Sequence, residues 1–131
     1  MEATVDIETT RIENKTIESI DTIHCIVAKH YRTGEVREWV GSQCQEFGEW
    51  SKKIDQFIMH NGISFDAPLL NKFTGSTITP LQVRDTLLES QLFNPVREGG
   101  HSLESWGERL GFAKLDFHDF GEFSPLMLEY C

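Results

Sequence analysis

The period of the hydrophobic pattern changes near residues 41–42, and this change limits the folds that the chain can adopt. Before it, apolar residues mark three extended segments at residues 3–8, 22–30 and 35–40, the second of which is a near-continuous apolar run. Residues 33–34 (Thr-Gly) are a turn signal between the last two segments. The first forty residues therefore predict three strands joined as an antiparallel meander.

After the change, helical and extended patterns alternate. Apolar residues from Cys44 to Ile54 recur at spacings of three to four, whereas residues 57–59 form an apolar run too short for a helix. The predicted elements are a helix at 44–54, a strand at 57–59, a helix at 66–75, a strand at 81–84 and a helix from 86 to the Asn94-Pro95 stop. We therefore expect an α/β fold, with a mixed five-stranded sheet (an antiparallel three-strand meander plus parallel strands) flanked by helices.

Local signals place the helix ends. Asp66, Asp85 and Ser102 are candidate N-caps, and Gly75 and Gly111 are candidate C-terminal stops. Leu69, Leu70 and Phe73 are expected to give the helix at 66–75 a buried face. The helix from 86 bears Leu87, Leu88 and Leu92, and a helix at 103–110 has Leu103, Trp106 and Leu110 on one face. The loop at 112–123 carries Phe112, Phe117, Phe120 and Phe123, which we interpret as packing rings and not as a base-stacking platform.

A last helix is predicted to begin at Ser124-Pro125, because Ser is a good N-cap and Pro is favoured at the first helical position. It runs to Cys131, so it has about seven residues where helices of roughly 10 to 14 are usual. We therefore expect residues 1–131 to be a single domain that is truncated within its last helix.

Composition narrows the class of protein. With 131 residues, 39% of them hydrophobic and 25% charged, the chain predicts one globular domain with a sizeable core. It carries no leader pattern and no apolar run near the roughly 20 residues of a membrane span, which predicts a cytoplasmic protein. The three cysteines have no metal-ligand spacing, and we expect them to be reduced and packed. A net charge of −9 argues against broad binding to phosphate backbones, but not against an enzyme that holds a strand end through metal ions.

Asp6 and Glu8 form an acidic pair on the first predicted strand. Because strand side chains alternate between faces, residues two apart leave the backbone on the same side. Two carboxylates on one face repel each other unless a cation or a hydrogen-bond donor lies between them. With 21 acidic residues in 131, roughly three such pairs arise by chance, so the pair alone does not distinguish a metal site from a solvated surface.

Further segments carry a family resemblance. Residues 6–8 (Asp-Ile-Glu) resemble the first motif of DEDD-type 3′→5′ exonucleases, and residues 60–66 (His-Asn-Gly-Ile-Ser-Phe-Asp) contain the second, Asn-x3-(Phe/Tyr)-Asp. Residues 85–86 (Asp-Thr) and the segment 101–111 (His-x-Leu-Glu-x-Trp-Gly-x-Arg-Leu-Gly) resemble the proofreading exonuclease domain of bacteriophage family A DNA polymerases. The resemblance covers nearly the whole chain and implies an RNase H-like fold.

The third family motif is Tyr-x3-Asp, and Tyr130 resembles its beginning, which places the aspartate three residues beyond Cys131. His118 and Asp119 resemble the His-type version of this motif. However, position 123, where that version requires an aspartate, is Phe123, so we prefer the Tyr subtype. The resemblance thus implies a fragment or split gene product of a longer polymerase. In a phage, its location would be the host cytoplasm.

The chemistry implied by the resemblance is two-metal hydrolysis of 3′-terminal phosphodiesters of DNA, with Mg²⁺ or Mn²⁺ as the ions. By this resemblance, Asp6 bridges both ions, Glu8 ligates the ion that holds the water, and Asp66 supports the second ion. Tyr130 orients the water. The residues implied to contact the terminal nucleotide are Asn61, Phe65 and, through its backbone, Thr9. The implied partner is the 3′ end of single-stranded DNA, or of RNA. Without the fourth carboxylate, we expect this chain to cleave DNA weakly or not at all.

Other interpretations of the same residues stay open. Asp66 can be interpreted as an N-cap alone, and Asp85 is better interpreted as an N-cap than as a metal ligand. His60 and His101 are better interpreted as packed or hydrogen-bonded side chains than as catalytic residues. The alternative functions are a non-catalytic RNase H-like module that binds nucleic acid or protein, and a small RNA exonuclease of the same superfamily.

Overall fold

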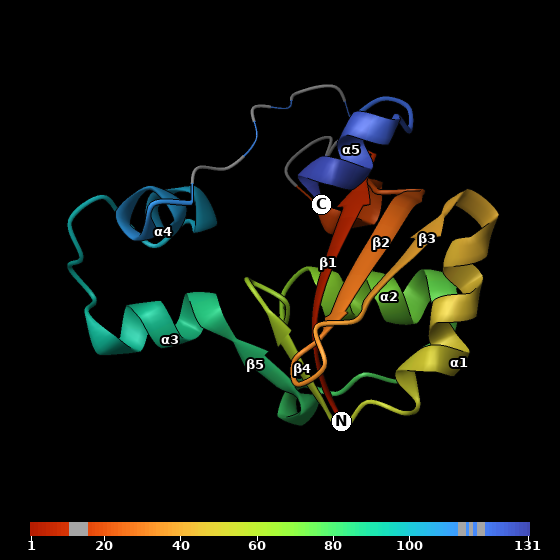
Figure 1. Cartoon of the computed structure of the whole chain (residues 1–131), viewed down its shortest axis with the longest axis horizontal. Helices are drawn as coiled ribbons and strands as arrows, with labels where there is room; N and C mark the ends of the chain where they lie inside the picture. Colours follow the sequence, from red (N-terminus) through yellow and green to blue (C-terminus); the bar gives the residue numbers. More distant parts are fainter. Residues whose placement is uncertain (11–15, 113–114, 116, 118–119) are drawn as a thin grey trace.

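The computed structural model describes residues 1–10, 16–112, 115, 117 and 120–131. Within these ranges five strands form one sheet in the order β3-β2-β1-β4-β5 (Figure 1). The strands are β1 (Glu2–Thr9), β2 (Ile23–His30), β3 (Val36–Val40), β4 (Gln56–Met59) and β5 (Val83–Asp85). β1, β2 and β3 pair antiparallel, whereas β4 pairs parallel with both β1 and β5. The predicted mixed sheet is confirmed, and β1 is its central strand.

The helices follow the predicted order. They are α1 (Phe47–Ser51), α2 (Asp66–Thr74), α3 (Thr86–Phe93), α4 (Leu103–Leu110) and α5 (Pro125–Tyr130), with 3₁₀ turns at Ile17–Ser19, Gly41–Glu46 and Pro80–Gln82. In Figure 1, α3 and α4 lie beside the β5 edge of the sheet, and α5 lies at the opposite end of β1 from the N-terminus.

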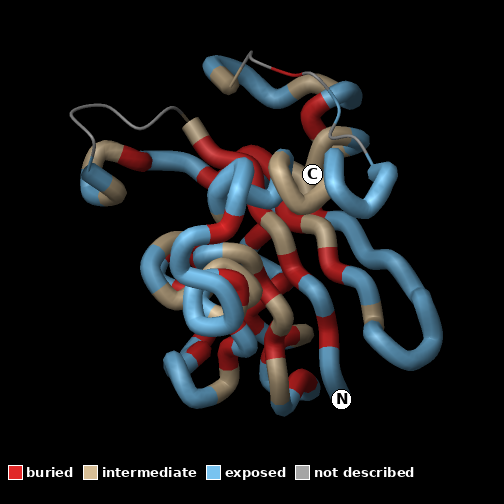
Figure 2. Tube along the Cα trace, turned by 90° about the vertical axis from the view of Figure 1, so that its left-hand side faces the viewer, coloured by how far each residue is buried: buried red, intermediate tan, exposed pale blue. Residues whose placement is uncertain are grey.

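The side chains of β1 alternate between the two faces of the sheet, and each face is covered by an apolar cluster. Ala3, Val5 and Ile7 are almost fully buried and join the main core, to which α1 and α2 contribute Phe47 and Leu70. The opposite face is covered by a second cluster, built from Cys25, Phe117 and Met127 with partly buried neighbours that include Tyr130 and Cys131. Figure 2 shows the buried residues following the inner strands, with exposed turns around them. Thr4, Asp6 and Glu8 therefore lie on the face of β1 that is turned away from the main core.

Local capping agrees with the sequence at three helices. The Asp85 carboxylate accepts hydrogen bonds from the Leu87 and Leu88 N–H groups at the start of α3. Ser102 and Ser124 cap α4 and α5 by accepting from the third residue of each helix. The predicted N-caps at these positions are confirmed, and Gly75 and Gly111 follow their helices with φ values of 72° and 80°.

The helix expected at residues 44–54 is shorter than predicted. A 3₁₀ turn at Gly41–Glu46 precedes α1, which ends at Ser51, so Ile54 lies beyond the helix although it is buried. Gly48 packs so closely on the end of α2 that a Cβ atom would clash with the Thr74 carbonyl oxygen. The apolar spacing thus predicted which side chains enter the core, but not the length of the helix.

The leucines of α3 and α4 lie largely outside the core. Leu88 and Leu92 are 44% and 82% exposed, and Leu103 and Leu110 are also exposed. The two helices instead contact each other through polar groups, because Ser90 Oγ accepts from Trp106 Nε1 at 2.8 Å and lies 2.7 Å from His101 Nδ1. The guanidinium of Arg97 stacks 4.0 Å from the ring centre of Trp106.

The phenylalanine loop is only partly a packing element. Phe117 is buried and packs edge-to-face on Phe120, with ring centres 5.1 Å apart, as predicted. Phe112 and Phe123 are 81% and 38% exposed, so their predicted packing role is wrong. The three cysteines are free thiols, and burial followed by the neighbouring Cys25 raises the pKa of Cys44 to about 11. None of the helices in the described ranges combines the length and apolar character needed to cross a bilayer.

Candidate active site

Asp6 and Glu8 lie at the end of β1 that α5 covers. The antiparallel register pairs Glu8 with Cys25 and Asp6 with Val27, so these four side chains share a sheet face. Ligand atoms of Asp6, Glu8 and Cys131 all lie within 4.8 Å of one another. Glu8 is buried and Asp6 is half-buried. The strand period therefore brings the two carboxylates together as the sequence indicates.

Asp66 approaches the same region from the start of α2. It is the first residue of the helix, and its predecessor Phe65 takes the N-cap position without a side-chain hydrogen bond, so the reading of Asp66 as an N-cap is wrong. Its side chain is 4% exposed. Burial, followed by the negative charge of Asp6, raises the pKa of Asp66 well above its ordinary value; Glu8 and Asp85 add to this, and a backbone hydrogen bond opposes it.

Tyr130 is held by an aromatic cluster. Its ring centre lies 5.4 Å from that of Phe117 and 5.9 Å from that of Phe120. The Phe120 carbonyl in turn lies 2.9 Å from His24 Nε2 on β2, which ties this segment to the sheet. The Tyr130 ring is thus packed on the preceding segment, which the contact between His24 and Phe120 ties to the sheet.

A cleft of about 920 Å³ opens beside Tyr130. Its lining residues are His60, Asn61, Leu87, Ser102, Leu103, Glu104, Leu115, Phe117, Phe120 and Tyr130. Asn61 is exposed at the end of β4 and adopts a positive φ of 62°, a conformation that Asn tolerates. The cleft therefore joins two residues predicted to act on the substrate, Asn61 and Tyr130.

The other two predicted substrate contacts lie nearby but outside the lining of this cleft. Phe65 is partly buried against the main core, immediately before Asp66. Thr9 is buried where the β1–β2 register shifts, and its hydroxyl donates to the Thr10 carbonyl at 2.9 Å. Both therefore flank the carboxylates along the chain.

Histidines near the site are hydrogen-bonded, as predicted. His60 Nδ1 lies 2.9 Å from Thr86 Oγ1, and His101 Nδ1 lies 2.7 Å from Ser90 Oγ. His118 and Asp119, the alternative third motif, lie outside the described residues.

Cys131 is the residue beside the carboxylates that the sequence did not indicate. Its thiol is hydrogen-bonded with Cys25, and this contact, then burial and the charge of Asp6, raises its pKa. No metal-ligand spacing announces it, because Cys25 and Cys131 lie on β2 and at the end of α5. The pairing of Cys25 with Glu8 across the sheet, together with the packing of Cys131 against the cluster of Cys25, brings the thiols to this place.

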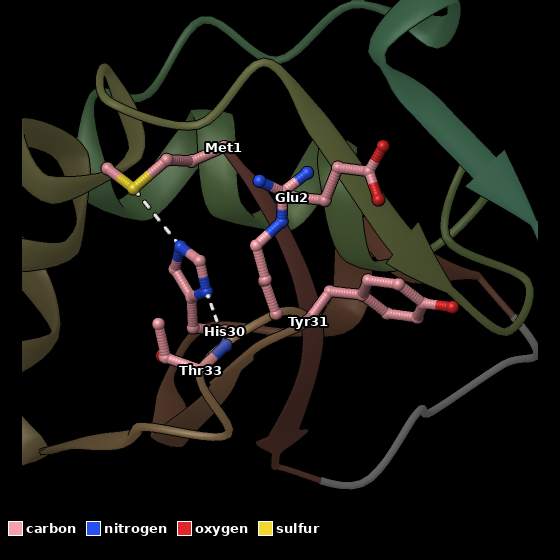
Figure 3. Close-up of a pocket in the computed structure, with 6 residues that line it drawn as sticks. Met1, Glu2, His30, Tyr31 and Thr33 are labelled. Carbon is pink, nitrogen blue, oxygen red and sulfur yellow. Dashed lines mark hydrogen bonds between the residues drawn. The ribbon is translucent and has the colours of Figure 1, made fainter.

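A second hollow, of about 500 Å³, lies at the opposite end of β1 (Figure 3). His30 there accepts from the Thr33 N–H through Nδ1 at 3.3 Å, so the neutral ring carries its proton on Nε2, 3.1 Å from Met1 Sδ. Six residues at about 3.3 Å each separate its Glu2 from Glu8, or roughly 20 Å along the strand. This hollow is therefore separate from the carboxylate site.

The donor set fits a hard divalent cation. Asp6, Glu8 and Asp66 offer carboxylate oxygens, the ligands that Mg²⁺ and Mn²⁺ prefer. The charges that raise the pKa of Asp66 are all negative, so an added cation would relieve their repulsion. Among the described residues, the group whose ligand atoms lie within 4.8 Å of one another consists of Asp6, Glu8 and the softer sulfur donor Cys131. Asp66 is outside this group, although the charges of Asp6 and Glu8 act on it.

Comparisons with known proteins find similarity to DNA polymerases. No protein-family model matches the chain. The chain is 27% identical over 136 aligned positions to the DNA-directed DNA polymerase of Escherichia phage T7, and 27% identical over 133 positions to that of Enterobacteria phage T3. Each alignment covers 81% of this chain and 19% of the polymerase, so the chain spans about a fifth of the length of these relatives.

The fold is similar to part of a solved polymerase. The family B DNA polymerase from the archaeon Pyrobaculum calidifontis matches with a TM-score of 0.53 and 14% identity, over 84% of this chain and 18% of that one. The chain resembles one domain of a DNA polymerase. Its mixed five-stranded sheet with flanking helices is consistent with the expected RNase H-like fold.

Proposed function

We propose that this chain is a metal-dependent 3′→5′ exonuclease domain of the proofreading type, which hydrolyses 3′-terminal phosphodiesters of DNA. The observation that carries the proposal is the close pair of Asp6 and Glu8 at the end of β1, whose negative charges also act on the buried Asp66. Similarity to phage DNA polymerases over 81% of the chain supports it. The proposed parent protein contains a polymerase domain, and the proposed location is the cytoplasm of a phage host.

Each residue has a proposed role. Asp6, Glu8 and Asp66 hold Mg²⁺ or Mn²⁺; when bound, two such ions supply the attacking hydroxide and stabilise the charge that develops on the phosphate. The Tyr130 hydroxyl orients the attacking water, and its ring is held for this by Phe117 and Phe120. Asn61, Phe65 and the Thr9 backbone hold the terminal nucleotide of a 3′ single strand.

We further propose that the 131-residue chain cleaves slowly. It supplies three of the four carboxylates that the family resemblance implies, and an error near 1 Å in the placement of reacting groups costs on the order of a hundredfold in rate. Rapid Mn²⁺-dependent release of nucleotides from a 3′ end by the purified chain would contradict this part of the proposal.

Calorimetric titration of Mn²⁺ into the parent and into Asp6→Ala tests the assignment of the site. Asp6→Ala is expected to lose most of the affinity, whereas Glu38→Gln, which removes one exposed charge on β3, is expected to keep it. Equal affinity in the parent and in Asp6→Ala would contradict the proposed site. Incubation of 3′-labelled single-stranded DNA and RNA with the parent then separates the alternatives: binding without metal-dependent cleavage favours a binding module, and faster cleavage of RNA favours an RNA exonuclease.

A further inference from the structure

Asp85 makes more hydrogen bonds than its helix cap requires. Its carboxylate is 5% exposed and caps α3 by accepting from Leu87 N–H at 3.0 Å and Leu88 N–H at 3.5 Å. The same carboxylate accepts from Asn61 N–H at 2.9 Å and from Ile63 N–H at 3.1 Å. Asn61 and Ile63 belong to the loop between β4 and α2, more than twenty residues away. Asp85 therefore connects α3 to the loop that precedes Asp66.

This loop has an unusual backbone path. Asn61 has a positive φ of 62°. Gly62 is buried, and a Cβ at this position would lie 2.6 Å from Met59 Sδ and even closer to Met59 Cβ. Because the loop is neither strand nor helix, its N–H groups lack the regular backbone acceptors of those elements, and buried N–H groups need acceptors. The Asp85 carboxylate supplies two of them.

The loop is hydrogen-bonded to the start of α2. Its first carbonyls accept from the first turn of the helix, because Phe65 N–H donates to Asn61 O at 3.1 Å and Ala67 N–H donates to Gly62 O at 2.8 Å. Asp66 lies between these two donors in sequence. A shift of the loop therefore moves the start of α2 and the Asp66 carboxylate with it.

We propose that Asp85 is a positioning residue for the candidate active site, because its carboxylate fixes the loop that sets the places of Asn61 and Asp66. This inference rests on the proposed function. The role proposed for Asp85 is to position the loop, because each of its oxygens accepts from a backbone N–H of that loop.

Two substitutions that remove the same charge test it. Asp85→Asn keeps one oxygen, which can retain the three bonds that Oδ1 now accepts, but it turns an amide NH₂ toward the Ile63 N–H. Asp85→Ser keeps a good N-cap for α3 but is too short to reach the loop. If position matters, Mn²⁺ affinity falls further in Asp85→Ser than in Asp85→Asn; by analogy with residues that orient metal ligands, the loss in Asp85→Ser is expected to be about 10- to 100-fold.

Hydrogen exchange of the loop amides provides a readout independent of metal. In Asp85→Ser the Asn61 and Ile63 amides should both lose protection, whereas in Asp85→Asn only Ile63 should. Glu38→Gln is the matched control, because it removes one exposed carboxylate charge on β3 and leaves the hydrogen bonds of Asp85 in place, and its Mn²⁺ affinity should equal that of the parent. Circular dichroism of each variant establishes that it is folded before titration.

The outcomes separate this inference from the proposed function. If Asp6→Ala loses affinity but both Asp85 variants bind Mn²⁺ like the parent, the positioning role is wrong and the site assignment stands. Equal losses in Asp85→Asn and Asp85→Ser mean that only the charge matters, which also overturns the positioning role. If Asp6→Ala binds like the parent, the proposed function and this inference both fall.

Discussion

Replacement of Asp66 by Asn is the sharpest test of how the carboxylates interact. The two side chains have nearly the same shape, but the amide carries no charge. Burial and then the charge of Asp6 raise the pKa of Asp66, so the ionised form is unfavourable in the folded, metal-free protein. We expect Asp66→Asn to increase the free energy of unfolding at neutral pH in EDTA, although it removes a residue of the proposed site.

The size of the effect follows from proton linkage. A carboxyl group whose pKa is raised on folding keeps its proton in the folded protein at pH values where the unfolded chain, with its ordinary value of 3.8, has lost it. The folded state then binds more protons, so the free energy of unfolding of the parent decreases as pH rises through this window. For one proton the slope is about 1.4 kcal/mol per pH unit. The difference between variant and parent should therefore be constant below pH 3.8, grow with this slope, and level off above the folded pKa.

Urea unfolding followed by tryptophan fluorescence, repeated across this pH range in EDTA, measures the difference directly. Other carboxyl groups titrate in both proteins and largely cancel. Glu38→Gln controls for the change in net charge, and its stability should stay within about 0.5 kcal/mol of the parent because Glu38 is exposed. A pH-independent difference, or an Asp66→Asn variant less stable than the parent at pH 7 without metal, would refute the electrostatic account.

Three further predictions concern packing and metal binding. Leu70→Ala in the main core should lower the free energy of unfolding by about 2 to 5 kcal/mol. Leu92 is 82% exposed on α3, so Leu92→Ala should change this free energy by less than about 0.5 kcal/mol. A large loss of stability of Leu92→Ala in urea unfolding would contradict the exposed arrangement. Gly62→Ala should cost about 1 to 3 kcal/mol, because its Cβ would press on the buried Met59 side chain, and unchanged stability would show that the loop can yield. Mn²⁺ at a hundred times its dissociation constant should raise the stability of the parent by about 2.7 kcal/mol in thermal or urea unfolding, and Asp6→Ala should show no such gain at the same concentration.

The sequence predicted the sheet well because strand signals and burial coincide there. Most of the apolar run of β2 is buried on both faces, Phe57 and Met59 of β4 are buried, and β1 shows the alternation that turns Asp6 and Glu8 to one side. Helix caps were also predictable, since they depend on a side chain and a backbone group only two or three residues apart.

The apolar residues of α3 and α4 show what hydrophobic periodicity leaves open. Periodicity identifies a face that is apolar, but it does not say what covers that face. Leu88 and Leu92 have the spacing of a core face, yet α3 is held to α4 by Ser90 and Trp106 and leaves those leucines exposed. Long-range polar contacts of this kind have no periodic signal in the sequence.

The same distinction applies to the candidate site. Asp6 and Glu8 are local to one strand, so their common face follows from the sequence alone. The closeness of Cys131 depends on how β2 pairs with β1 and on how α5 lies over them, and the bonds from Asp85 to the loop of Asn61 cross more than twenty residues. Contacts of these two kinds require the tertiary structure.

The metal-free site is a destabilising feature within a stable core. Glu8 and Asp66 are buried, and the charges acting on Asp66 are negative, so the ionised site opposes folding at neutral pH. An arrangement of this kind persists only where the surrounding structure enforces it and where its function requires it. The enforcing contacts are visible: the strand pairing fixes Glu8, and the Asp85 carboxylate with the tightly packed Gly62 fixes the approach to Asp66. A cation that binds the carboxylates would convert their repulsion into attraction, and so the same geometry that weakens the metal-free chain would stabilise the loaded one.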